Sequence, residues 1–254
     1  MPKHHDSVVE AQFGPRAKAY VESAVHAQGA DLEALSAIAV ERKPQHALDL
    51  GCGGGHVSYA LAPHATRVTA ADLSADMLAA VAAKAREKGF ANITTVETAA
   101  ERLPFADADF DFLACRYSAH HWQDFEGGLR RARRVLKTRA PAVFIDACSP
   151  GAALLDTHLQ AVELLRDTSH VRDYSIGEWT AALNRASFAM MSCRTWRLRM
   201  DFPVWTARMR TPADHIKAIR ALQEAASAET KAHFAIEDDG SFLLDIVMIE
   251  AVGA

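Results

Sequence analysis

The chain has 254 residues, and half of them are apolar, which suits one large α/β domain over residues 1–254. Its formal charge is −4 at pH 7, which argues against a protein that binds nucleic acid by bulk electrostatic attraction. Its four cysteines are far apart in sequence and show no disulfide or zinc pattern, which favours a reducing, cytoplasmic setting. No apolar run reaches membrane-spanning length and no signal peptide is evident, so we expect no membrane partner.

The first predicted elements are two helices between residues 13 and 42. Asp31 is expected to cap the second helix, because a short acidic side chain can accept hydrogen bonds from the free N–H groups of a first turn. The apolar stripe of this helix consists of Leu32, Leu35, Ile38 and Ala39. This spacing predicts an amphipathic helix that packs with the stripe inward.

Short apolar runs then alternate with helical patterns as far as residue 147. The runs that predict strands are Ala47–Leu50, Val68–Ala71, Ile93–Val96, Phe110–Cys115 and Ala142–Ala147. Between the second and third runs, Met77, Leu78, Val81 and Ala85 repeat at helical spacing. This alternation predicts a doubly wound, mostly parallel sheet with helices on its faces.

The alternation loosens after residue 150. Gly151–Arg166 and Ile176–Ala186 are predicted helices, and Cys193–Phe202 is a predicted sixth strand. Thr211 followed by Pro212 predicts a capped helix start, with the helix ending near residue 228.

The last predicted feature is a hairpin. Phe234–Glu237 and Phe242–Ala251 flank an Asp-Asp-Gly sequence, which is typical of a tight turn between two strands.

The most informative segment is the glycine-rich turn GCGGG at Gly51–Gly55, directly after the first predicted strand. Glycines tolerate positive φ values and let a ligand approach the backbone closely. Asp72 follows about twenty residues later, at the end of the next strand, where a carboxylate can accept both hydroxyls of a ribose. The segment therefore predicts binding of the adenosine half of a cofactor.

Two cofactor classes use this arrangement: dinucleotides and S-adenosylmethionine. The dinucleotide fingerprint G-x-G-x-x-G requires a third glycine where His56 stands, so that fingerprint fails. Asp49 two residues before the turn, and the sequence AERLPF at Ala100–Phe105, are further signals that favour S-adenosylmethionine.

With these residues the sequence resembles the class I S-adenosylmethionine-dependent methyltransferases, in the methyltransferase type 11 branch related to ubiquinone and menaquinone C-methyltransferases. The segments LDLGCGGG, AADLSADML, AERLPF, FDFLACRYSAHHW and RVLK carry the resemblance, in that order, between residues 45 and 147. It implies a seven-stranded Rossmann-like sheet with an antiparallel C-terminal strand and a helical insertion before the last strands. Residues 1–44 would form lid helices, 45–149 the cofactor-binding core and 150–254 the substrate cover.

The resemblance also implies roles for single residues. The glycines of the turn would form the floor beneath the methionine part of the cofactor, Asp49 would orient its ammonium group, and Asp72 would hold the ribose. The residues expected to bind the cofactor are Asp49, Gly51, Cys52, Gly53, Gly55, Asp72, Leu73, Met77, Ala100, Glu101, Arg116 and Tyr20. Ala99 stands where family members often carry an acid that accepts the adenine amino group, and here the chain departs from the family pattern.

His120 and His121 follow the fourth predicted strand, at the sheet edge where ligands bind. Either could act as a general base, and His121 is favoured because relatives often carry a histidine there. The alternative is that one caps an element while the other packs beside Trp122. Adjacent histidines are not spaced as metal ligands on a helix, so we expect no metal site.

The expected activity is transfer of a methyl group from S-adenosylmethionine, which becomes S-adenosylhomocysteine, to oxygen, nitrogen or carbon of a small metabolite. An anionic acceptor is one option, because several basic side chains fall in the predicted cover: Arg166, His170, Arg172, Arg208 and Arg210. Trp179 and Trp205 are candidates for an apolar substrate wall.

Two alternatives stay open at this point: a non-catalytic module that binds S-adenosylmethionine, and an RNA methyltransferase. The basic run Arg130–Arg134 is expected to be a solvated helix face, which makes nucleic acid the less favoured partner. The sequence does not separate a monomer from a homodimer.

Overall fold

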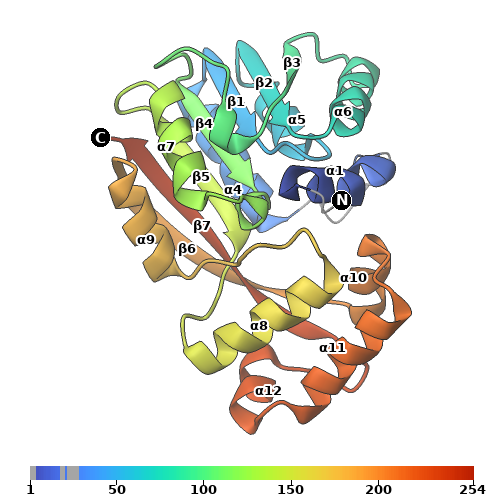
Figure 1. Cartoon of the computed structure of the whole chain (residues 1–254). Coiled ribbons are helices and arrows are strands. Elements are labelled where there is room, and N and C mark those ends of the chain that lie inside the picture. Colours follow the sequence, from blue (N-terminus) through green and yellow to red (C-terminus); the bar gives the residue numbers. More distant parts are fainter. Residues whose placement is uncertain (1–3, 18–20, 22–28) are drawn as a thin grey trace.

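The computed structural model describes residues 4–17, 21 and 29–254, and its core is one twisted sheet flanked by helices (Figure 1). The strands in chain order are β1 (His46–Leu50), β2 (Arg67–Asp72), β3 (Ile93–Glu97), β4 (Phe112–Arg116), β5 (Pro141–Ala147), β6 (Phe188–Met200) and β7 (Phe242–Gly253). Their order across the sheet is β3-β2-β1-β4-β5-β7-β6, and β7 runs antiparallel to both of its neighbours, β5 and β6. The predicted seven-stranded, mostly parallel sheet with an antiparallel C-terminal strand is confirmed.

The described helices cover both faces of this sheet. They are α1 (His5–Phe13), α4 (Ala30–Arg42), α5 (His56–Leu61), α6 (Ala75–Glu87), α7 (Phe125–Val135), α8 (Ala153–Arg166), α9 (Ile176–Arg185), α10 (Phe202–Met209), α11 (Ala213–Ala225) and α12 (Ala228–Phe234). Because both faces are covered, a central strand such as β1 is buried along its whole length. Among the described residues, no helix is both long and apolar enough to cross a membrane.

The segment after β5 forms a helical layer beside the long β6–β7 pair (Figure 1). Helix α8 packs against α11 and α12, and α12 also contacts β7. Trp205 of α10 is almost fully buried and lies edge-on to Phe242 at the start of β7, with ring centroids 5.1 Å apart. This layer is the predicted helical insertion, although no sequence pattern predicted α10 or α12 within it.

The predicted hairpin is wrong. Phe234 is the last residue of α12, and Ala235 caps that helix with a left-handed φ of 45°. Strand β7 pairs antiparallel with β5 on one side and with β6 on the other, where the pairing runs from Phe188 to Met200. The Asp-Asp-Gly sequence does form a turn, in which Asp239 accepts a hydrogen bond from the Ser241 N–H, but it joins a helix to a strand.

Two predicted helix caps are also wrong. The N-cap of α4 is Gly29, and Asp31 lies inside the first turn, where its carboxylate pairs with Arg116 of β4 at 2.6 Å. The N-cap of α11 is Pro212, while the hydroxyl of Thr211 donates to the carbonyl of Arg166. In both cases the side chain that the local sequence predicted as a helix cap instead binds a partner far away in the sequence.

Candidate functional site

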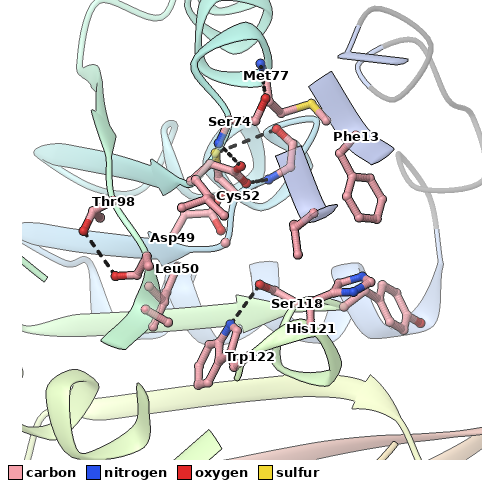
Figure 2. Close-up of a pocket in the computed structure, with 18 of the residues that line it drawn as sticks. Phe13, Asp49, Leu50, Cys52, Ser74, Met77, Thr98, Ser118, His121 and Trp122 are labelled. Atoms are coloured by element: carbon pink, nitrogen blue, oxygen red, sulfur yellow. Dashed lines mark hydrogen bonds between the residues drawn. The ribbon is translucent and has the colours of Figure 1, made fainter. Parts of the chain in front are cut away.

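The sheet order reverses between β1 and β4, which lie side by side although their connections leave in opposite directions. In open α/β sheets, ligands bind in the crevice at the carboxyl ends of such strands. A cavity of about 1120 Å³ lies at this position, bordered by the ends of β1, β2 and β4 and by α1 (Figure 2).

Most of the predicted cofactor residues line this first cavity. They are Asp49, Gly51, Cys52, Gly53, Asp72, Leu73, Met77, Ala100, Glu101 and Arg116. Tyr20 lies outside the described residues. Gly55 does not line the cavity: it begins α5 with φ 78°, and a Cβ there would come within 2.8 Å of the Tyr59 ring. Gly55 was expected to form part of the floor beneath the cofactor, but here a glycine is needed for the positive φ at the start of α5.

The glycines of the turn have different physical roles. At Gly51 (φ 71°) an added Cβ would lie 1.9 Å from the Ser118 hydroxyl. The absence of a side chain at Gly51 therefore allows the loop after β4 to pack against the turn. At Gly53 (φ 47°) an added Cβ would meet no atom of the described residues within 4 Å. Gly53 therefore opens directly onto the cavity, and its N–H donates to Asp72 at 2.8 Å.

Asp72 is fixed at the end of β2 by backbone donors. One carboxylate oxygen accepts from the Gly53 N–H and the other from the Ser74 N–H at 3.0 Å. Burial raises the pKa of Asp72, and these two N–H groups oppose that shift. The carboxylate is thus held rigidly at the cavity wall with acceptor capacity to spare.

Asp49 is the most deeply buried acid of the cavity, with an exposed fraction of 1%. One of its oxygens accepts from both the N–H and the hydroxyl of Ser58, at 2.9 and 2.6 Å. Burial raises its pKa to about 7, although the bonds from Ser58 lower it in part. A bound cation would stabilise the ionised form of this carboxylate.

Helix α1 closes one side of the first cavity through His5, Asp6, Val9 and Phe13. Asp6 pairs with Arg102 and accepts a hydrogen bond from the Gln123 side chain. Of these residues, His5, Asp6 and Val9 were missed because the first predicted helix began only at residue 13, and no local sequence signal indicates their long-range partners.

A second cavity of about 1510 Å³ adjoins the first. The residues common to both walls are Phe13, Arg116, Tyr117 and His121. Phe13 and His121 face each other there with ring centroids 5.0 Å apart (Figure 2). We call these four residues the junction.

The second cavity combines apolar and charged walls contributed by α8, α10, β6, β7 and the loop before α9. The apolar members include Trp196, Leu198, Met200, Val204, Trp205, Met209, Leu244 and Ile246. The charged members include Asp31, Glu163, Arg166, Asp167, Asp173, Arg197, Arg199, Asp201 and Arg208. A cavity with both kinds of wall suits an amphipathic small molecule.

The two candidate histidines have opposite electrostatic surroundings. Burial lowers the pKa of His120, but the Asp146 carboxylate, 2.6 Å from Nδ1, raises it overall to about 9. Burial and the neighbouring charge of His120 lower the pKa of His121 to about 4. His121 lies at the junction, with Nδ1 3.0 Å from the Ser169 carbonyl, whereas His120 lines only the second cavity.

The predicted basic cluster is only partly assembled. Arg166 and Arg208 line the second cavity, whereas Arg172 pairs with Asp156 and Glu178 away from it.

His170 and Arg210 do not line the second cavity either; His170 is buried against Gln160. Of the two tryptophans, Trp205 lines the cavity beneath the Arg166 guanidinium, while Trp179 packs in the core against Phe125.

The comparisons with known proteins agree with this architecture. A methyltransferase domain model matches residues 48–144. The chain is 44% identical over 201 residues to the uncharacterized protein YafE of Escherichia coli. The matched region covers 79% of this chain and 97% of that protein. It is 33% identical over 248 residues to the uncharacterized methyltransferase YcgJ of Bacillus subtilis. The matched region covers 96% of this chain and 98% of that protein.

The crystal structure of YcgJ has a TM-score of 0.84 to this chain at 32% identity, over 87% of this chain and 97% of that one. A demethylmenaquinone methyltransferase of Chlorobaculum tepidum is 33% identical over 116 residues, or 45% of this chain and 46% of that protein. The chain therefore belongs to the class I S-adenosylmethionine-dependent methyltransferases, in the branch that includes the ubiquinone and menaquinone C-methyltransferases.

Proposed function

We propose that the first cavity binds S-adenosylmethionine, that the second binds a small-molecule acceptor, and that the methyl group passes between them at the junction. The observation that carries this proposal is that the two cavities adjoin and share four lining residues, Phe13, Arg116, Tyr117 and His121. Methyl transfer requires the nucleophile, methyl carbon and sulfur to be aligned, which two sites that meet at the same four residues would allow.

The side chains of the first cavity fit the parts of the cofactor. The methionine part would lie over Gly53 with its ammonium near Asp49, and the ribose hydroxyls would donate to Asp72. Met77 and Leu73 supply apolar contacts for the adenine ring. S-adenosylmethionine supplies the electrophilic methyl group, and these residues only bind and orient it.

The second cavity supports an acceptor with an apolar body, and an anionic group on it would find Arg166 and Arg208. The nucleophile can be oxygen, nitrogen or carbon. Where it carries a proton, we propose that His121 removes it, because this side chain lies at the junction. The acceptor would enter from the helical layer of α8 and α10.

A single-turnover reaction tests the proposed function. The full chain, loaded with methyl-labelled S-adenosylmethionine, is mixed with a fractionated small-metabolite extract, and we expect S-adenosylhomocysteine and one labelled small product. Product formation only with RNA would instead indicate an RNA methyltransferase. Cofactor binding without any turnover across all fractions would indicate a non-catalytic module.

Cofactor affinity should depend on pH through Asp49. This carboxylate has a pKa of about 7, so about a tenth of it is ionised at pH 6 and about half at pH 7. Because the ionised form binds the ammonium group, we expect affinity to rise about fivefold between pH 6 and pH 7.

Stability of the free protein should change in the opposite direction. The folded pKa of Asp49 is raised, so the folded state retains a proton that the unfolded state loses, and stability falls as pH rises from about 4 towards 7. Calorimetric titration with S-adenosylhomocysteine and thermal melts measure the two effects. Asp49→Asn should remove both, and an unchanged affinity profile in that variant would contradict the assignment.

A further inference from the structure

Asp173 is a buried carboxylate that the proposed function does not use. It lies in the loop between α8 and α9, in the wall of the second cavity, with an exposed fraction of 1%. No described residue donates a hydrogen bond to this carboxylate, and its Oδ2 is fully enclosed. A buried carboxylate without hydrogen bonds is costly, so its position in a cavity wall points to a ligand.

The loop that carries Asp173 is held firmly in place. The Asp173 N–H donates to the side-chain oxygen of Gln160 on α8, and the side-chain NH₂ of Gln160 donates to the Asp173 carbonyl at 2.8 Å. Earlier in the loop, the N–H groups of Val171 and Arg172 both donate to the carbonyl of His120. The unpartnered carboxylate therefore results from an ordered arrangement.

His120 and Asp146 lie beside Asp173. One potential ligand atom from each of these three residues lies within 4.8 Å of the others. The Nδ1 atom of His120 is hydrogen-bonded to Asp146, and no described residue forms a hydrogen bond with its Nε2. A histidine oriented by a carboxylate through one ring nitrogen is the usual support for a metal ligand.

The surrounding charge is also favourable for a cation. Glu163 of α8 lines the same cavity, is buried, and pairs through one oxygen with Arg166 at 3.3 Å. The acids gathered at this end of the cavity are Asp146, Glu163, Asp167 and Asp173, and the bases closest to them are His120 and Arg166. Acidic side chains therefore outnumber basic ones at this end. Burial raises the pKa of Glu163 and Asp173, and a bound cation would stabilise their ionised forms.

We propose that His120 and Asp173, with Asp146 beside them, form a binding site for a divalent transition-metal ion in the wall of the second cavity. A mixed imidazole and carboxylate set suits ions such as Mn²⁺, Fe²⁺, Co²⁺ or Zn²⁺. Neighbouring ligands of a tetrahedral ion lie about 3.4 Å apart, so the side chains would have to move closer together to close the cluster. An alkylammonium group would use the carboxylates but not the ring nitrogen of His120.

Sequence spacing gave no signal for this site. Its three residues come from the segment after β4, from β5 and from the loop before α9, whereas the expectation of no metal rested on the spacing of the cysteines and of histidines adjacent in sequence. An ion here would keep positions open towards the cavity, where an oxygen of the acceptor could bind. Metal binding itself does not depend on methyl transfer, so the two proposals can fail separately.

The test is direct metal binding to the tag-free full chain after chelator treatment, without cofactor or acceptor. Free Mn²⁺ is followed by electron paramagnetic resonance, and bound Co²⁺ by its visible absorption. We expect one ion per chain, and Asp173→Asn should weaken binding by at least about tenfold.

The matched control is Asp201→Asn, which removes the same charge from the wall of the same cavity, outside the cluster. Asp201 caps α10 by accepting from the Val204 N–H, and asparagine caps as well as aspartate. Circular dichroism and S-adenosylhomocysteine affinity verify that both variants fold. The proposal is overturned by wild-type protein that binds no metal, by equal binding in Asp173→Asn, or by an alkylamine that binds there where metals do not.

Discussion

Replacing Gly53 with valine is expected to abolish cofactor binding while the sheet stays folded. The added side chain would point into open space in the first cavity, since no atom in the described part of the chain lies within 4 Å of a Cβ at this position. That space is the proposed location of the methionine part of the cofactor. We expect affinity for S-adenosylhomocysteine to fall by more than about 100-fold, equivalent to about 2.8 kcal/mol.

The variant also carries backbone strain, which must be separated from blockage of the site. Gly53 has φ 47°, and an L-residue in the left-handed region costs about 1–2 kcal/mol. Gly89→Val is the matched control, because Gly89 has φ 77°, an equally open Cβ position and a location after α6 away from either cavity.

Calorimetry and thermal melts on both variants give a clear decision. Both should melt at lower temperature by similar amounts, while only Gly53→Val loses cofactor affinity. Gly53→Ala should fall between valine and wild type, because its single methyl group occupies less of the cavity. Full affinity in Gly53→Val would show that the cofactor does not lie over this glycine.

The sequence could predict the parallel part of the sheet because its strands are buried on both faces. Leu48 and Leu50 of β1, and Phe112 and Leu113 of β4, have exposed fractions near zero, so these strands read as apolar runs. The glycine turn and Asp72 were predictable for a related reason. Their chemistry lies within one strand–turn–helix–strand unit and needs no distant partner.

The antiparallel end of the sheet could not be predicted in this way. Strand β6 is largely exposed, and its arginines pair across to β7, as Arg197 does with Asp245 and Arg194 with Glu250. A local turn signal at Asp238–Gly240 therefore suggested a hairpin, but the pairing was decided by contacts some 50 residues apart in sequence.

The second cavity escaped prediction because it belongs to no single segment. Its walls come from β6, β7, α8 and α10, and the arginines expected to define it divide between cavity and surface. Arg166 lines it, while Arg172 is held away by Asp156 and Glu178. Sequence identifies the residue types in such a cover, but their packing decides which of them face the acceptor.

The second large effect is expected at Asp72. Removing this carboxylate in Asp72→Ala should weaken cofactor binding by about 1.5–3 kcal/mol, the usual contribution of hydrogen bonds to a charged group. This corresponds to about a 10- to 150-fold loss of affinity. The physical reason is that the ribose hydroxyls would lose an acceptor that Gly53 and Ser74 hold in position.

Two further variants separate the hydrogen-bonding role of Asp72 from general damage to α6. Asp72→Asn keeps an acceptor oxygen for one of the two backbone donors, so its loss of affinity should be smaller than that of Asp72→Ala. Asp76→Ala removes an exposed acid from the first turn of the same helix, outside the first cavity, and should leave affinity unchanged. Burial raises the pKa of Asp72, so the negative charge of this side chain does not add to the stability of the free protein. If Asp72→Ala bound S-adenosylhomocysteine as tightly as Asp76→Ala, the ribose would have to lie elsewhere in the cavity.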